Sequence, residues 1–276
     1  MGNESKQVHP RVCEECGRVS HERIWRKEVT EKGTNTFPRD YRPELDTTPE
    51  LSSDKANYYQ SQIGILRWMV ELGRVDMITE VSLLASQLAN PREGHLETVF
   101  HMFAYLKNKH NSRMVFDPTY PEIDMSVFKK CDWKHFYGEV KEAIPLNTPK
   151  LCSKEVDLHM FVDSDHAGDN LTRRSRTGFL IYLNMAPIVW HSKKQSTIET
   201  SVFGSEFMAL KNGMESLRGL RYKLRMMGVE LLGPSFIYED NMSVIHNTQR
   251  PESTLKKSLT VFVFMQFMKL LPWESV

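Results

Sequence analysis

Cysteine is scarce in this sequence, which has four among 276 residues. Only Cys13 and Cys16 are close together, whereas Cys131 and Cys152 stand alone. This spacing excludes a small fold held by several disulfides and favours a reducing compartment. We therefore expect an intracellular protein, and the cysteines do not distinguish the cytoplasm from the nucleus.

The pair formed by Cys13 and Cys16 also has the spacing of half a zinc site, with His9 and His21 on either side. A complete site needs a second pair of ligands at the spacing of a zinc finger. Zinc binding at Cys13 and Cys16 is therefore left open.

Long apolar runs are missing too. Residues 1–7 lack the apolar centre of a signal peptide. Residues 259–271 are apolar, but Gln266 and Lys269 interrupt them, and they fall short of the ~18 residues that a membrane helix needs. We expect no membrane partner.

The chain also lacks an excess of charge of either sign, since 36 basic and 35 acidic residues give a net charge of +1. A neutral total does not exclude nucleic acid, because a basic face can be local. A hydrophobic content of 40% is enough for a real core, and the length allows one large domain or two ordinary ones.

The first half of the chain reads as an arm followed by helices. Pro38, Pro43 and Pro49 punctuate a polar arm over residues 1–52. Apolar residues at helical spacing then predict three helices, which begin at residue 53, run over 74–88 and run over 94–109. Together they suggest a small helical subdomain over 53–113. Prolines and charges return over 114–154, which we interpret as a linker.

The second half predicts an α/β fold with a mixed sheet. Strands are expected at 155–162, 178–183, 187–191 and 235–238, with a hairpin between the second and the third. A long helix should begin near residue 201 or 205 and end before Gly228, and a short helix should cover 241–246. Strands and helices in this order predict a sheet covered by helices over 155–257, followed by an apolar tail over 258–276.

Acidic residues stand where these elements end. Asp163, Asp165 and Asp169 follow the apolar run 158–162, Glu206 lies on the long helix, and Asp240 follows the fourth strand. This layout is typical of a two-metal nuclease, in which hard oxygen ligands hold two Mg²⁺ or Mn²⁺ ions. We expect crowding to raise pKa values until an ion binds. Asp165 is an additional candidate ligand or merely exposed, and the competing interpretation is an acidic turn with Glu206 and Asp240 solvated.

Basic residues gather near these acids in three groups that could contact phosphates. The groups are Arg173, Arg174 and Arg176; Lys193 and Lys194; and Arg218, Arg221 and Arg225 along one face of the long helix. The alternative is an ordinary solvated surface. We expect Phe179 and Trp190 in the core and structural roles for His166 and His191, while His246 has no assigned role.

Several ordered motifs resemble Ty1/copia-type retrotransposon polyproteins over about residues 37–257. Tyr-Tyr-Gln-Ser-Gln-Ile-Gly (58–64), Arg-Val-Asp-Met (74–77) and Pro-Arg-Glu-Gly-His-Leu-Glu (91–97) are similar to the segment that follows the polymerase core. Their ribonuclease H domain is resembled by Asp-Ser-Asp-His-Ala-Gly-Asp (163–169), Arg-Arg-Ser-Arg-Thr-Gly-Phe (173–179), Trp-His-Ser-Lys-Lys-Gln (190–195), Gly-Ser-Glu-Phe-Met-Ala-Leu (204–210) and Glu-Asp-Asn-Met-Ser-Val (239–244).

The resemblance implies a ribonuclease H-like domain that binds an RNA–DNA hybrid and cuts its RNA strand. Asp163, Glu206 and Asp240 would be its catalytic and metal-binding acids. The helices over 53–113 would belong to the thumb or connection of a reverse transcriptase, and the polymerase part of the same element would be a further partner.

The sequence departs from the family in two places. The Tyr-x-Asp-Asp motif of the polymerase is missing, so DNA synthesis is not expected. After residue 257 the family continues into a polar helix that often carries a fourth acid, whereas this chain turns apolar. We interpret the change as a frameshift or an out-of-frame gene end, so that the domain is C-terminally incomplete and its fifth strand and last helix are lost or improvised. A catalytically inactive nucleic-acid-binding remnant, or an inert pseudogene product, is therefore the alternative to an active nuclease.

Overall fold

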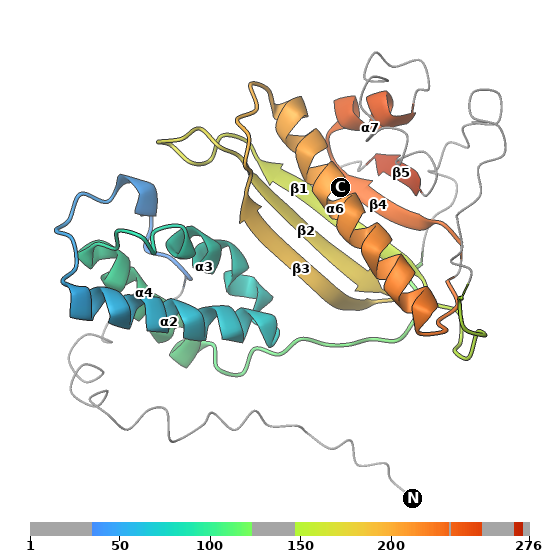
Figure 1. Cartoon of the computed structure of the whole chain (residues 1–276), viewed down its shortest axis with the longest axis horizontal. Coiled ribbons are helices and arrows are strands. Elements are labelled where there is room, and N and C mark those ends of the chain that lie inside the picture. Colours follow the sequence, from blue (N-terminus) through green and yellow to red (C-terminus); the bar gives the residue numbers. More distant parts are fainter. Residues whose placement is uncertain (1–34, 123–146, 232, 250–267, 273–276) are drawn as a thin grey trace, which may run out of the picture. The chain divides into compact units, whose positions relative to one another are not determined.

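The computed structural model describes residues 35–122, 147–231, 233–249 and 268–272 (Figure 1). These residues form two compact units. One comprises 35–63 and 87–112, and the other comprises 64–86 and the described residues from 113 onward. The division falls inside the first long helix, and the domain boundaries expected from the sequence remain predictions.

The helical segments begin close to where the sequence predicts them. The structure has η1 (Pro43–Leu45), α2 (Ser53–Glu71), η2 (Val75–Met77), α3 (Ile78–Ala85) and α4 (Glu93–Asn108). The helix predicted over 74–88 is shorter and opens with the 3-10 turn η2. The predicted helices that begin at residue 53 and run over 94–109 are confirmed as α2 and α4.

A polar network in the first unit holds the start of α4. The Thr48 hydroxyl accepts a hydrogen bond from the Gly94 amide at 2.9 Å. His95 accepts one from the Arg92 amide at Nδ1, at 2.9 Å, and its Nε2 lies 2.9 Å from the Pro43 carbonyl oxygen. The bonds from the Gly94 and Arg92 amides satisfy groups that the start of a helix leaves without intrahelical partners, and the His95 contact ties the helix to Pro43.

The second unit contains one mixed sheet. Its strands are β1 (Leu158–Asp165), β2 (Arg176–Leu183), β3 (Ala186–Lys194), β4 (Ser235–Glu239) and β5 (Met268–Pro272), in the order β3-β2-β1-β4-β5. The first three strands pair antiparallel, whereas β4 runs parallel to β1 and β5 runs parallel to β4. The predicted α/β class and all four predicted strands are confirmed.

The fifth strand comes from the part of the sequence that departs from the family pattern. Met268 pairs with Ser235 and Pro272 pairs with Glu239 along the edge of β4. A strand can pair through its backbone alone, so the apolar tail supplies this edge although its residues do not follow the family. Of the two expectations for the fifth strand, lost or improvised, the structure has the second.

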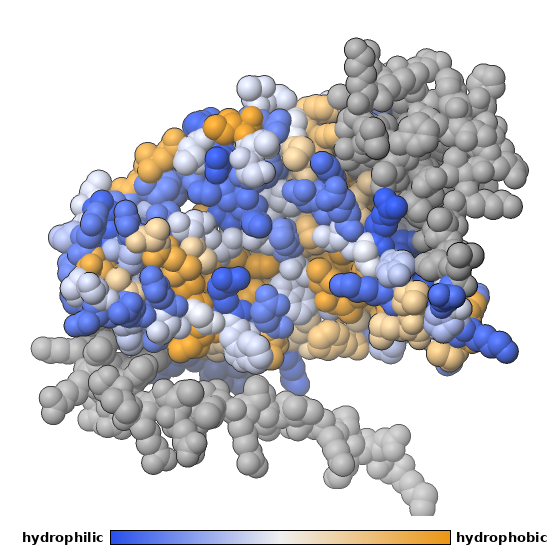
Figure 2. Space-filling model, viewed as in Figure 1, coloured by the Kyte–Doolittle hydropathy of each residue, from blue (hydrophilic) through white to orange (hydrophobic). Residues whose placement is uncertain are grey.

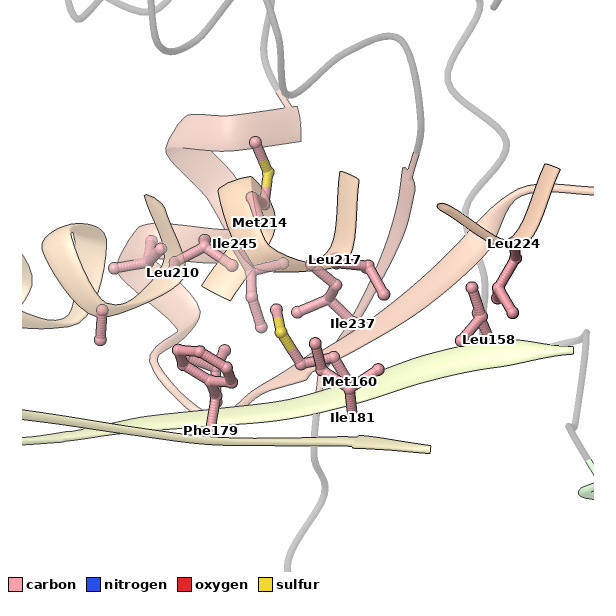
Figure 3. Packing of buried hydrophobic residues seen from close by; sticks show 13 residues of the cluster. Leu158, Met160, Phe179, Ile181, Leu210, Met214, Leu217, Leu224, Ile237 and Ile245 are labelled. Carbon is pink, nitrogen blue, oxygen red and sulfur yellow. The ribbon is translucent and has the colours of Figure 1, made fainter. Parts of the chain in front are cut away.

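Besides α3 and the end of α2, the described residues of this unit include the helices α6 (Val202–Met226) and α7 (Met242–Gln249). Helix α6 crosses the sheet (Figure 1), and its apolar face packs on β1, β2 and β4 around Met160, Ile181 and Ile237 (Figure 3). Gly213 permits this close approach, because a Cβ there would lie 2.8 Å from the Met160 sulfur. The expected core position of Phe179 is confirmed, while Trp190 is only half-buried.

Hydrophilic and hydrophobic residues are interspersed over the face drawn in Figure 2. Trp68 on α2 and Leu72 directly after its end are among the exposed apolar side chains. None of the helices in the described ranges is long and apolar enough to cross a membrane.

Candidate metal centre

Three carboxylates that are far apart in the sequence meet at one edge of the sheet. Asp163, Glu206 and Asp240 each offer an oxygen atom, and these atoms all lie within 4.8 Å of one another. The two aspartates are exposed and Glu206 is buried. Among the described residues, this is the group of acidic, histidine and cysteine side chains arranged so that it could hold a metal ion.

The topology explains the meeting of the two aspartates. Strands β1 and β4 are parallel neighbours, with Phe161 opposite Tyr238. The carboxyl ends of parallel neighbours lie at the same edge of a sheet. Asp163 is two residues beyond Phe161 and Asp240 is two residues beyond Tyr238, so the shared register brings both to that edge.

Helix α6 brings the third carboxylate. The Ser201 side chain caps this helix by accepting a hydrogen bond from the Gly204 amide at 3.1 Å. Glu206 follows two residues later, near the positive end of the helix dipole, which favours a negative charge. The Ser201 cap fixes where α6 begins, and the packing of α6 on the sheet places Glu206 beside the ends of β1 and β4.

Burial and crowding act together on Glu206. They raise the pKa of its carboxyl to about 8, with burial as the largest cause and the charges of Glu239, Asp163 and Asp240 adding to it. One of its oxygens, Oε2, is buried and has no hydrogen-bond partner. The rise in pKa expected from the sequence is confirmed for Glu206, and a cation among these groups would reverse it.

Glu239 interacts electrostatically with these acids, and the sequence analysis did not name it as a site residue. Its side chain is 2% exposed. Burial raises its pKa to about 8, and the charges of Asp240 and Asp163 add to this against a hydrogen bond from the Asn241 amide. The sequence does contain a signal for an inward-facing acid. Glu239 and Asp240 are adjacent at the end of β4, and neighbouring residues of a strand point to opposite faces. One of the two therefore had to point inward.

Asp165 does not join the group of three. Its carboxylate lies against Gly168, so closely that a Cβ atom at Gly168 would collide with it. On the sheet, Asp165 is opposite Arg176. Asp165 therefore contacts the loop between β1 and β2, where Gly168 leaves room for its carboxylate.

Asp169 organises the rest of that loop. Burial would raise its pKa, but hydrogen bonds from Thr172 and Lys194 outweigh burial and lower it to about 2. The Lys194 ammonium lies 2.9 Å from Asp169 Oδ2. Lys194 is thus held in an ion pair, whereas Lys193 beside it is exposed.

The other basic residues of the loop occupy different environments. Arg173 is exposed and adopts a left-handed backbone conformation with φ of 56°, and Arg174 is half-buried. Arg176 is buried, and its guanidinium donates to the Ser82 hydroxyl at 2.6 Å. Arg176 therefore links β2 to α3 and does not share the exposed surface with Arg173.

The three arginines of α6 are separated in the same way. Arg218 is exposed and Arg225 is half-buried. Arg221 is 4% exposed and donates to the Ser235 hydroxyl at 2.7 Å. The predicted basic face of the helix is thus interrupted at its middle, where Arg221 turns toward β4.

Two histidines make structural contacts close to the acids. His166 Nδ1 lies 3.1 Å from the Ser205 hydroxyl oxygen. His191 stacks on Phe179 with a centroid distance of 4.6 Å, and burial together with the Lys193 charge lowers its pKa. His246 is exposed on α7.

Cys13 and Cys16, with the suggested zinc ligands around them, lie outside the described residues.

No protein-family model matches the chain. The chain is 32% identical over 96 residues to the retrovirus-related Pol polyprotein from transposon RE2 of Arabidopsis thaliana, covering 35% of this chain and 7% of that protein. It is 24% identical over 216 residues to the corresponding polyprotein from transposon RE1, covering 78% of this chain and 12% of that protein. It is also 25% identical over 167 residues to the secreted RxLR effector protein 161 of Plasmopara viticola, covering 60% of this chain and 94% of that protein.

The chain therefore has homologues among the retrovirus-related Pol polyproteins of copia-type transposons. It spans a small part of their length, 7% of one and 12% of the other. The family expected from the sequence motifs is confirmed.

Proposed function

We propose that the second half of this chain is a ribonuclease H-like domain that binds RNA–DNA hybrids and cleaves the RNA strand with Mg²⁺ or Mn²⁺. The observation that carries the proposal is the meeting of Asp163, Glu206 and Asp240 within 4.8 Å at the edge of the sheet. Homology to retrovirus-related Pol polyproteins of transposons supports it, since the resemblance to this family implies a domain that acts on RNA–DNA hybrids.

The three acids fit a hard divalent cation. Carboxylate oxygens are the donors that Mg²⁺ and Mn²⁺ prefer, and the buried Glu206 Oε2 has no other partner among the described residues. Asp163, Glu206 and Asp240 would hold the ions. Bound there, two ions would activate a water molecule and stabilise charge on the leaving oxygen of a phosphodiester.

The chain's own residues would place the hybrid beside these acids. Arg173, Lys193 and Arg218 are exposed and free to approach phosphates, and Arg174 and Arg225 are half-buried. Contacts of this kind are independent of base sequence and weaken as salt increases. Arg176, Arg221 and Lys194 are engaged with Ser82, Ser235 and Asp169, so we assign them to supporting roles.

The substitution Asp163→Asn tests the nuclease. The purified chain should cut the RNA strand of a labelled hybrid in Mg²⁺, and the variant should fall to the level of the blank, because an amide is a weaker ligand than a carboxylate. Asp54→Asn on α2 is the matched control and should cut as the parent does. Equal cutting by the parent and the Asp163→Asn variant would rule out the metal assignment.

A catalytically inactive remnant that only binds nucleic acid is the second candidate. It is favoured by the departure of the sequence from the family after residue 257, where the family often places a fourth acid. Hybrid binding in low salt without cleavage by the parent chain would support this candidate. Restored cleavage on adding a reverse-transcriptase polymerase fragment of the family would instead favour a partner supplied separately.

A further inference from the structure

Three buried oxygen atoms beside the acidic centre have no hydrogen-bond partner. They are Ser164 Oγ, Glu206 Oε2 and Glu239 Oε2, and their residues are 8%, 5% and 2% exposed. Buried polar atoms in folded proteins nearly always have a partner, which is a protein group, a water molecule or an ion. Three such atoms beside one acidic centre indicate that a polar group or an ion occupies the space there.

The backbone brings the three atoms to the same side of the sheet. Val162 and Ile237 belong to the core cluster that residues of α6 complete, so both face that helix. Alternate residues of a strand share a face, so Ser164, two residues after Val162, and Glu239, two residues after Ile237, also face α6. Glu206 comes from that helix and is buried against the same face.

The centre thus has two layers. Asp163 and Asp240 form an exposed outer layer, and Ser164, Glu206 and Glu239 form a buried inner layer. Two buried carboxyl groups beside one another are unfavourable unless a cation or a proton lies with them. In the part of the chain that the structure describes, Glu239 Oε1 accepts a hydrogen bond from the Asn241 amide, and Oε2 of each glutamate is buried without a partner.

We propose that Glu239, with Glu206 and Ser164, forms an inner cation seat that adjoins the Asp163–Glu206–Asp240 site and shares Glu206 with it. This inference rests on the proposed function, because the outer site is its starting point. The seat has two carboxylates and one hydroxyl, all hard oxygen donors suited to Mg²⁺ or Mn²⁺, and water would complete the shell. Glu239 would then be a fourth carboxylate of the centre, supplied by β4.

Counting bound ions tests the seat without relying on activity. The whole chain is titrated with Mn²⁺ alone, and free Mn²⁺ is measured by electron paramagnetic resonance. Glu239→Gln keeps the side-chain volume and removes the charge, and it should bind one ion fewer than the parent. Glu215→Gln, at an exposed position of α6, is the matched control and should bind the same number of ions as the parent.

A second variant and a folding check keep the test decisive. Ser164→Ala should bind Mn²⁺ more weakly, and it replaces Glu239→Gln if circular dichroism shows that Glu239→Gln does not fold. If Glu239→Gln binds as many ions as the parent, a proton or a water molecule fills the inner layer and the seat is wrong.

The variant Asp163→Asn separates this inference from the proposed function. If Asp163→Asn lowers Mn²⁺ binding while Glu239→Gln and Ser164→Ala do not, the inner seat fails and the outer site remains. If none of the three lowers Mn²⁺ binding, both the seat and the proposed metal site fail.

Discussion

The same chemical group, a carboxylate, has opposite surroundings in the two units. At the start of α4, Asp46 accepts hydrogen bonds from the Thr48 amide at 2.8 Å, from the Thr48 hydroxyl at 2.6 Å and from the Tyr41 hydroxyl at 2.6 Å. At the metal centre, Glu206 and Glu239 each keep a buried oxygen without a partner and crowd other acids. Burial would raise the pKa of Asp46, but its hydrogen bonds lower it, whereas the pKa values of Glu206 and Glu239 rise to about 8.

The difference separates a carboxylate that stabilises the fold from carboxylates that await a ligand. A charge is favourable inside a protein when donors surround it, and costly when its neighbours carry the same sign. The environment of Asp46 is complete without any other molecule. The environment of Glu206 and Glu239 becomes favourable only when a proton or a cation joins it.

The largest expected effect is on the free energy of unfolding. Neutralising Asp46 should lower it, whereas neutralising Glu206 should not. Asp46→Asn should lower the free energy of unfolding by about 1–3 kcal/mol, since its donors lose a charged acceptor. Glu206→Gln should leave the metal-free protein equally or more stable, because it removes repulsion. Urea unfolding in a chelator measures both variants. A loss of stability in Glu206→Gln as large as that in Asp46→Asn would contradict the comparison.

The two sets should also differ in their response to pH. The folded-state pKa values of Glu206 and Glu239 lie above the unfolded value, so without metal their contribution favours folding at low pH and is lost as pH rises toward about 8. The folded-state pKa of Asp169 is lowered to about 2, so its contribution is present above the unfolded value and is lost as pH falls toward about 2.

Thermal unfolding across this pH range, in a chelator, checks the signs. The melting temperature should fall between weakly acidic and weakly alkaline pH, and the double variant Glu206→Gln with Glu239→Gln should flatten that slope. Added Mg²⁺ should raise the melting temperature most at the alkaline end. A parent slope that the double variant leaves unchanged would place its origin elsewhere.

A smaller effect should distinguish the buried Arg221, which stabilises the fold, from the exposed Arg218 on the same helix. Arg221→Gln should lower stability by about 1 kcal/mol or more, because it removes a buried charged donor from Ser235. Arg218→Gln should leave stability within about 0.5 kcal/mol and weaken hybrid binding at low salt. Urea unfolding and fluorescence anisotropy with a labelled hybrid measure the two effects. Equal effects of both variants on binding would mean that Arg221 also reaches the hybrid.

Much of the fold could be read from the sequence because its local signals agree. Alternating and helical apolar patterns located the four strands before the tail and the long helix to within a few residues. The shorter signals were weaker, as the helix predicted over 74–88 shows, since η2 and α3 cover only part of it. The sequence left open whether a fifth strand is lost or improvised, because the pairing of β5 depends on a free edge of β4 and not on its own pattern.

The sequence by itself determined which acids end strands or lie on the long helix, and so it named Asp163, Glu206 and Asp240. Only the tertiary structure decided which polar residues join them. It turned Glu239 and Ser164 inward, set Asp165 against Gly168, and drew Arg176 and Arg221 into hydrogen bonds with Ser82 and Ser235. The reason is physical: a local pattern fixes the periodicity of a side chain, but its burial and its partners depend on which distant element packs over it.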